Sequence, residues 1–278
     1  VTAVAVPEST NPEDVSTTVK AFMAADLPHE LIKLLEPIVL QPSAFSDNRS
    51  LKNLLMLTAI RTDKAKVTGY IERLSGYDVD EIAKIAIDHG LFEEAFQIYS
   101  KAGQNTDAMD VLVEHIVSID RAQHFANKLN LPEIWSRLGK AQLDGLRVKD
   151  AMDSYVRAED PSNFEEVIEI AERAGREEEL IRYLQMARKL TREPKIDTEY
   201  AYCLAKAHRL SDMEEFLSMT NVADVLHVGE KCFNDGLYEA SRLLFSSVSN
   251  YARLATTLVY LNDFPGAIEA ARKAGNTS

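Results

Sequence analysis

A short sequence pattern typical of helices recurs nine times along the chain, and its spacing limits the folds that the sequence can adopt. The clearest copy reads Leu91-Phe92-Glu93-Glu94-Ala95-Phe96-Gln97-Ile98-Tyr99, with Phe92 as its anchor. The nine anchors are Pro28, Lys64, Phe92, Ile119, Val148, Glu177, Met213, Tyr238 and Phe264. Their spacings of 36, 28, 27, 29, 29, 36, 25 and 26 residues are typical of stacked helical hairpins. The recurring pattern therefore predicts a repeat protein built from short helices.

The third residue after each anchor is often small. These positions hold Leu31, Val67, Ala95, Ala122, Ala151, Leu180, Phe216, Ser241 and Ala267, so five of the nine are Ala or Ser. Positions 0, 3 and 7 of a helix share one face. We therefore expect the third position to lie where neighbouring helices approach closely, and packing alone would account for the repeat.

Helix boundaries are marked densely, whereas strand signals are nearly absent. Asn11 followed by Pro12 predicts a capped helix start, and Ser162 and Ser211 each precede a Glu at capping-box spacing. Glycines at expected helix ends are Gly90, Gly103, Gly145, Gly175, Gly236 and Gly275. Pro37 lies inside an apolar run and predicts a kink or an early helix end near Glu36. The fold class predicted from these signals is all-α.

Composition excludes several classes of function. With 31 Lys and Arg against 44 Asp and Glu, the chain carries a formal charge of −13, which argues against binding to nucleic acid. No apolar stretch approaches the roughly 20 residues that span a bilayer, so we expect no direct membrane insertion. Two cysteines, Cys203 and Cys232, are too few for a disulfide scaffold and predict reduced thiols in the cytosol. Because the chain opens without Met and its last repeat stops at Ser278, we expect a segment of a longer protein.

The sequence contains no motif for catalysis. It has no Gly-rich phosphate loop followed by Lys, no His-Glu-x-x-His, no Cys-x-x-Cys and no Gly-x-Ser-x-Gly. His115 and His124 lie close in sequence, but a metal site would need a third ligand, and ordinary surface or partly buried histidines are the simpler interpretation. Trp135 is interpreted as a packed core residue. We therefore expect no enzyme, no cofactor and no metal.

One basic segment stands out on this acidic chain. Between positions 182 and 195 a single acidic residue, Glu193, opposes five cations, which are Arg182, Arg188, Lys189, Arg192 and Lys195. Cations gathered near a helix C-terminus complement the helix dipole, and this explanation needs no partner. The alternative is a docking point for an acidic partner segment. The polar residues 191–197 also form the best candidate for a weak joint in the stack.

Longer stretches of the sequence closely resemble the clathrin heavy chain family. One of them reads Tyr183-Leu184-Gln185-Met186-Ala187-Arg188-Lys189. The others cover residues 19–23, 25–32, 91–96, 135–136, 140–143, 158–162 and 248–259. The resemblance extends from about residue 12 to the end, without large gaps.

The resemblance implies an α-solenoid, a right-handed superhelix of stacked short hairpins, in a coat protein of cytoplasmic vesicles and coated pits. It implies a structural role in intracellular protein transport and endocytosis, as part of a leg near the knee and proximal region. The implied partners are other heavy-chain legs in the polyhedral lattice and the clathrin light chain, with homotrimer formation through a region absent here. The basic segment is the candidate light-chain docking site.

The resemblance also suggests how the chain divides. We expect residues 1–20 to end a preceding repeat, residues 21–163 to form one clathrin heavy chain repeat of about five hairpins, and residues 164–278 to form a second, truncated repeat. The alternative function is a helical-repeat scaffold or adaptor of a vesicle-tethering complex. An adaptor of this kind predicts a concave groove with converging polar and aromatic side chains, whereas the repeated positions here are mostly small and apolar.

Overall fold

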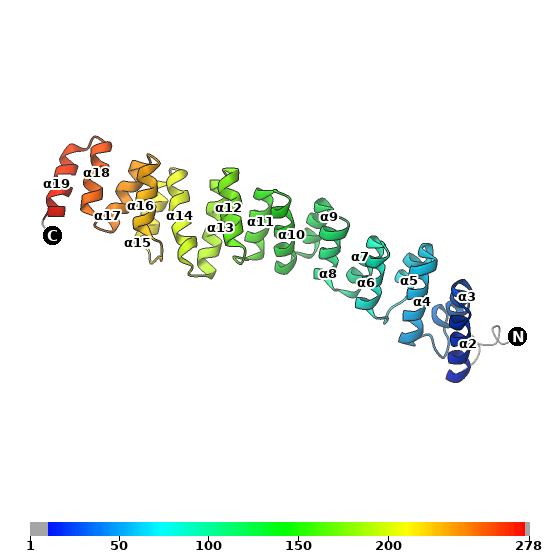
Figure 1. The fold of residues 1–278 in the computed structure, drawn as a ribbon. Coiled ribbons are helices and arrows are strands. Elements are labelled where there is room, and N and C mark those ends of the chain that lie inside the picture. The colour runs from blue at the N-terminus through cyan, green and yellow to red at the C-terminus, as the bar shows by residue number, and fades with distance from the viewer. Residues whose placement is uncertain (1–10, 276–278) are drawn as a thin grey trace. The chain divides into compact units, whose positions relative to one another are not determined.

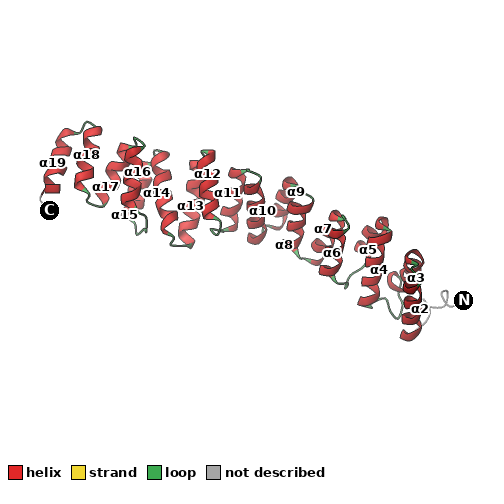
Figure 2. Ribbon diagram, viewed as in Figure 1, coloured by secondary structure: helices red, strands yellow, loops and turns green. Residues whose placement is uncertain are grey.

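The computed structural model describes residues 11–275, and in this part of the chain every regular element is helical (Figures 1 and 2). Successive helices form hairpins, and hairpin contacts are made mainly with the next hairpin in the chain. The chain divides into two compact units, Val1–Lys128 and Leu129–Ser278. The predicted all-α solenoid is confirmed. None of the described helices is both long and apolar enough to cross a membrane.

The first unit begins with the hairpin α2 (Pro12–Ala24) and α3 (Pro28–Leu40). It continues through α4 (Arg49–Thr62), the 3₁₀ turn η2 (Lys64–Lys66), α5 (Val67–Arg73), α6 (Val79–Asp88), α7 (Phe92–Ala102), α8 (Asn105–Asp110), the π-helical turn η3 (Val111–His115) and α9 (Ile119–Leu129). One apolar core follows these helices from Val15 to Val111.

The second unit has the same construction, with longer helices in its middle. Its helices are α10 (Pro132–Asp144), α11 (Val148–Ala158), α12 (Phe164–Ala174), α13 (Glu177–Leu190), α14 (Pro194–Lys206), α15 (Leu210–Ser218), α16 (Val225–Asn234), α17 (Tyr238–Ser247), α18 (Tyr251–Tyr260) and α19 (Phe264–Gly275). A continuous core runs from Leu143 to Leu244, and a small cluster around Leu258 follows it.

Eight of the nine predicted anchors are the first residue of the second helical segment of a hairpin. The remaining anchor, Met213, is wrong, because α15 begins three residues earlier at Leu210. With Leu210 as the anchor, the spacings on either side become 33 and 28 residues, so the second 36-residue spacing disappears. Met213 instead occupies the third position and is fully buried. The prediction that the third position lies at helix contacts is confirmed, since all nine of these side chains are buried.

A left-handed residue stands two positions before eight of the corrected anchors. These residues are Asp26, Gly90, Val117, Leu146, Gly175, His208, Gly236 and Asn262. A positive φ at this point turns the chain sharply between the two helices of a hairpin. The glycine signals identified only part of the pattern. Gly145 has a φ of −82° because the turn uses Leu146 instead, and Gly275 is the last residue of α19.

The predicted helix start at Asn11 is confirmed, because its side chain accepts a hydrogen bond from the backbone N–H of Glu13 at 3.1 Å. Both predicted capping boxes are wrong. Ser162 lies in a turn, where its backbone N–H and hydroxyl donate to Asp160, and Ser211 lies inside the first turn of α15. Pro37 does not end its helix near Glu36, since α3 continues to Leu40 while Ile38 and Val39 remain buried. Tertiary packing overrides the local signal here.

Glycines allow two hairpins of the second unit to close tightly. A Cβ at Gly139 in α10 would lie 3.2 Å from the ring of Tyr155 in α11, and one at Gly229 in α16 would lie 2.8 Å from Phe245 in α17. Both rings stand seven residues after their anchors, Val148 and Tyr238. The same offset of the repeat therefore presses an aromatic ring against a helix backbone in both hairpins.

Candidate functional site

The basic segment of the sequence spans the end of α13, a three-residue turn and the start of α14. Arg188 and Lys189 lie in the last turn of α13, and the turn of residues 191–193 leads to Pro194. Only this short turn is non-helical, so most of the predicted joint belongs to helices. Two cations therefore do complement the negative end of a helix dipole, as the simpler interpretation requires.

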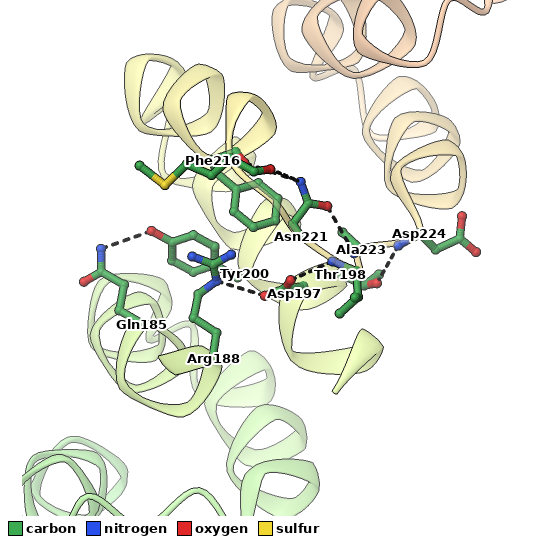
Figure 3. Close-up of polar contacts among 11 residues, drawn as sticks. Gln185, Arg188, Asp197, Thr198, Tyr200, Phe216, Asn221, Ala223 and Asp224 are labelled. Carbon is green, nitrogen blue, oxygen red and sulfur yellow. Dashed lines mark hydrogen bonds and ion pairs between the residues drawn. The ribbon is translucent and has the colours of Figure 1, made fainter. Parts of the chain in front are cut away.

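Arg188 is held in place by an ion pair and by two aromatic rings (Figure 3). Its Nε donates to Oδ1 of Asp197 at 2.9 Å, and the side chain of Asp197 is only 7% exposed. The guanidinium carbon lies 5.3 Å from the ring centre of Tyr200 and 4.7 Å from that of Phe216. Arginine stacks well on aromatic faces, so its position is fixed before any partner arrives.

Asp197 also holds the loop that follows α15. Its Oδ2 accepts a hydrogen bond from the backbone N–H of Val222 at 2.9 Å. In the same loop, the backbone N–H of Asp224 donates to the hydroxyl of Thr198 at 2.9 Å (Figure 3). Two side chains at the start of α14 thus fix the chain between α15 and α16.

These elements enclose a polar recess of about 460 Å³. It is lined by Arg188, Lys189, Leu190, Thr191, Arg192, Asp197, Thr220, Asn221 and Val222. Lys189 and Arg192 are exposed, and within the described residues neither makes an ion pair or a side-chain hydrogen bond. The recess therefore has one fixed cation and two unpaired ones.

The other two predicted cations lie outside the recess lining. Nη2 of Arg182 lies 3.0 Å from Oδ1 of Asp153 on α11, and Nζ of Lys195 lies 3.4 Å from Oε1 of Glu165 on α12. The structure thus brings Arg188, Lys189 and Arg192 together, whereas Arg182 and Lys195 connect neighbouring hairpins. Docking of an acidic segment stays a prediction.

A sequence signal for these connecting pairs exists but was missed. Arg182 and Asp153 are 29 residues apart, and Lys195 and Glu165 are 30 apart, which is about one repeat. In the first unit, Arg121 and Glu93 are paired at a separation of 28. Opposite charges one repeat apart therefore mark contacts between consecutive hairpins.

A second polar cluster was also missed by sequence reasoning. Oε1 of Glu199 on α14 is buried and has no hydrogen-bond partner, and Glu172 on α12 lies beside this carboxyl group. Burial, then the hydrogen bond to Glu172 and its negative charge, raise the pKa of Glu199 to about 7, while Lys231 and Lys206 act in the opposite direction. Nζ of Lys231 lies 3.8 Å from Oε1 of Glu172. Burial and the neighbouring Glu172 thus favour the protonated form of Glu199, and two lysines nearby oppose this effect.

The other residues singled out in the sequence have structural roles. Trp135 is 2% exposed and donates from Nε1 to Asn130 at 2.9 Å, so its assignment to the core is confirmed. The His115 ring stacks on Phe92 with centroids 5.2 Å apart, whereas His124 lines a separate recess with Phe125. Among the described residues, no group of three or more His, Cys, Asp or Glu is arranged to hold a metal ion.

Comparison with known proteins places the chain in a family. A family model described as "Region in Clathrin and VPS" matches residues 6–150 and 155–278. The probable clathrin heavy chain of Schizosaccharomyces pombe is 57% identical over 276 residues, which cover 99% of this chain and 17% of that protein. The clathrin heavy chain of Drosophila melanogaster is 51% identical over 273 residues, with coverages of 98% and 16%. Human clathrin heavy chain 2 is 50% identical over 273 residues, with coverages of 98% and 17%. The chain thus spans about a sixth of the length of these relatives.

Proposed function

Since the chain belongs to the clathrin heavy chain family, we propose that it is a structural segment of a coat-forming leg on cytoplasmic vesicles and coated pits. The observation that carries this proposal is the match along nearly the whole chain, without a large gap, to proteins named clathrin heavy chain. The nine hairpins supply the mechanism. Within each unit the hairpins bury their apolar faces against their neighbours, and a stack of this kind would give a leg its stiffness.

A segment exchange tests this proposal. In the full-length heavy chain of Schizosaccharomyces pombe, the matching segment is replaced by this chain, and coat assembly is measured by sedimentation and electron microscopy. We expect the hybrid to assemble closed coats and to support uptake of a fluorescent tracer. A second hybrid with Ala151→Arg places a charge at a fully buried helix contact and should fail. A stable hybrid that forms no coats would contradict the proposal.

The partners that fit this role are other heavy-chain legs and an acidic segment docked near α13. We propose the clathrin light chain as the acidic partner, with Lys189 and Arg192 as the cations that it contacts. This choice is supported by the exposure of both side chains and by their lack of an ion pair among the described residues. Lys189→Glu with Arg192→Glu should abolish capture of the light chain by the full-length hybrid. Capture equal to that of the parent hybrid would rule out this site but leave the coat role intact.

A further inference from the structure

The polar recess at the α13/α14 turn has a charge pattern suited to a small dianion. The charge of Arg188 is balanced by Asp197, whereas Lys189 and Arg192 have no acidic partner among the described residues. Two positive charges are therefore left over at the lining of a recess of about 460 Å³. A single carboxylate would neutralise only one of them.

Arg188 contributes hydrogen-bond donors as well as charge. Its ion pair with Asp197 uses Nε, and the described contacts include no hydrogen bond from Nη1 or Nη2. Because the rings of Tyr200 and Phe216 hold the guanidinium, these donors are already oriented. Two parallel N–H groups of arginine suit the oxygens of a phosphate.

Neutral donors line the same recess. Thr191 lies on the α13/α14 turn, and Thr220 and Asn221 lie on the loop after α15. The Asn221 amide is occupied within the loop, because its Nδ2 donates to the carbonyls of Met219 at 3.1 Å and Phe216 at 3.4 Å. The neutral donors left for a ligand are therefore the hydroxyls of Thr191 and Thr220. Hydroxyl donors from two different elements can reach an anion that the three cations surround, which favours an oxygen-rich ligand with several acceptors.

We propose that this recess binds a phosphate monoester carried by an acidic peptide segment of a partner protein. The proposal deepens the docking role of the α13 segment and rests on it. A phosphorylated side chain carries a charge of about −1.5 to −2 at neutral pH, which matches the two unpaired cations. Its three terminal oxygens can accept from Arg188, Lys189 and Arg192 at once.

A peptide suits the site better than a lipid headgroup does. The whole chain carries a formal charge of −13, so an anionic membrane would repel the molecule as a whole. A flexible peptide places one phosphate in the recess without bringing a large charged surface near the chain.

Isothermal titration of the chain at about 0.15 M salt tests the proposal. The probes are a short glutamate-rich peptide with a central phosphoserine, the same peptide with aspartate at the centre, inorganic phosphate, and vesicles containing phosphatidylinositol phosphates. We expect the phosphopeptide to bind at least about tenfold more tightly than the aspartate peptide, with weak binding of inorganic phosphate. Equal binding of both peptides, or binding to the vesicles alone, would overturn the proposal.

Two charge-matched double variants separate the recess from general electrostatics. Lys189→Gln with Arg192→Gln should weaken phosphopeptide binding by about tenfold or more, whereas Arg182→Gln with Lys195→Gln should change it by less than about twofold. All four residues are exposed, so both variants should melt close to the parent. Equal weakening by both variants would overturn the site. If the phosphopeptide fails to bind while the coat hybrid assembles, this inference falls and the coat role stands.

Discussion

The α10/α11 hairpin and the α13/α14 junction lie in the same unit and join helices of similar length, yet they differ in how closely the helices pack. In the first, Gly139 lets the Tyr155 ring press against a helix backbone. In the second, a buried carboxylate, Asp197, holds Arg188 and the backbone of the following loop. The polar pair buried in the α10/α11 hairpin is satisfied internally, because the Ser154 hydroxyl donates to Gln142 at 2.6 Å, whereas the polar joint between α13 and α14 leaves a recess lined with donors. We infer that the first kind of contact stiffens the stack, and the second carries the binding site proposed above.

The largest effect on stability should come from placing a larger side chain at the close contact between α10 and α11. Gly139→Leu would drive a side chain into Tyr155 and should lower the free energy of unfolding by about 3 kcal/mol or more, measured by urea unfolding. Gly69→Leu in α5 is the matched control, because a Cβ at Gly69 has no atom within 4 Å. It should be neutral or stabilising by up to about 1 kcal/mol, since leucine favours helix. Similar destabilisation by both changes would show that the close contact does not limit residue size.

Removing the carboxylate of the polar joint should have the next largest effect. Asp197→Ala leaves Arg188 and the N–H of Val222 without their acceptor and should cost about 2 to 4 kcal/mol in thermal or urea unfolding. Asp153→Ala breaks the exposed pair with Arg182 and should cost less than about 1 kcal/mol. If the two variants lost equal stability, burial would not be what distinguishes this junction.

The stability of the chain should also depend on pH through Glu199, in the second polar cluster described above. Its pKa of about 7 in the folded chain exceeds the ordinary value of 4.5, so the folded chain keeps a proton that the unfolded chain has released. The free energy of unfolding therefore falls as the pH rises from about 4.5 to about 7, and above this range the loss is complete. Glu199→Gln should remove this loss and exceed the parent by about 1 to 3 kcal/mol at pH 8.

Urea unfolding at several pH values measures this difference. Glu165→Gln is the control, because Glu165 is an exposed carboxylate in the same unit, and its curve should stay parallel to that of the parent. A Glu199→Gln curve that is also parallel to the parent would mean that the folded chain does not raise the pKa of Glu199.

The smallest effects on stability are predicted for single residues in the α10/α11 turn and the α13/α14 turn. Leu146 has a φ of +58°, whereas Thr191 at the α13/α14 turn has an extended backbone with φ of −141°. Leu146→Gly should therefore stabilise the chain by about 0.5 to 1 kcal/mol, because glycine relieves the left-handed strain. Thr191→Gly should destabilise it by about 0.5 kcal/mol, because glycine only adds freedom to the unfolded chain. Calorimetric melting that shifts in the same direction for both would contradict this contrast.

The sequence was sufficient for the repeat but not for the roles of individual cations. Periodic small residues such as Ala95 and Ala151 predicted which positions are buried, because helix contacts recur at fixed offsets. The anchor at Met213 was misplaced by three residues, because the pattern placed the helix start at this buried apolar residue, whereas α15 begins at Leu210, two residues after the left-handed turn at His208. Arg182, Arg188 and Lys189 look alike in the sequence, and only the folded chain brings Asp153 and Asp197 to the first two. The boundaries predicted between the two heavy chain repeats stay a prediction.

Burial of both native thiols makes the chain well suited to site-specific labelling. Cys203 and Cys232 are almost fully buried, and burial raises the pKa of both thiols, so the reactive thiolate scarcely forms at neutral pH. Cysteines introduced at the exposed turn residues Val117 and Leu146 would then be the ones that react with a maleimide dye. One of these residues lies in each compact unit. A donor and acceptor attached there would measure, by energy transfer, the distance between one position in each unit.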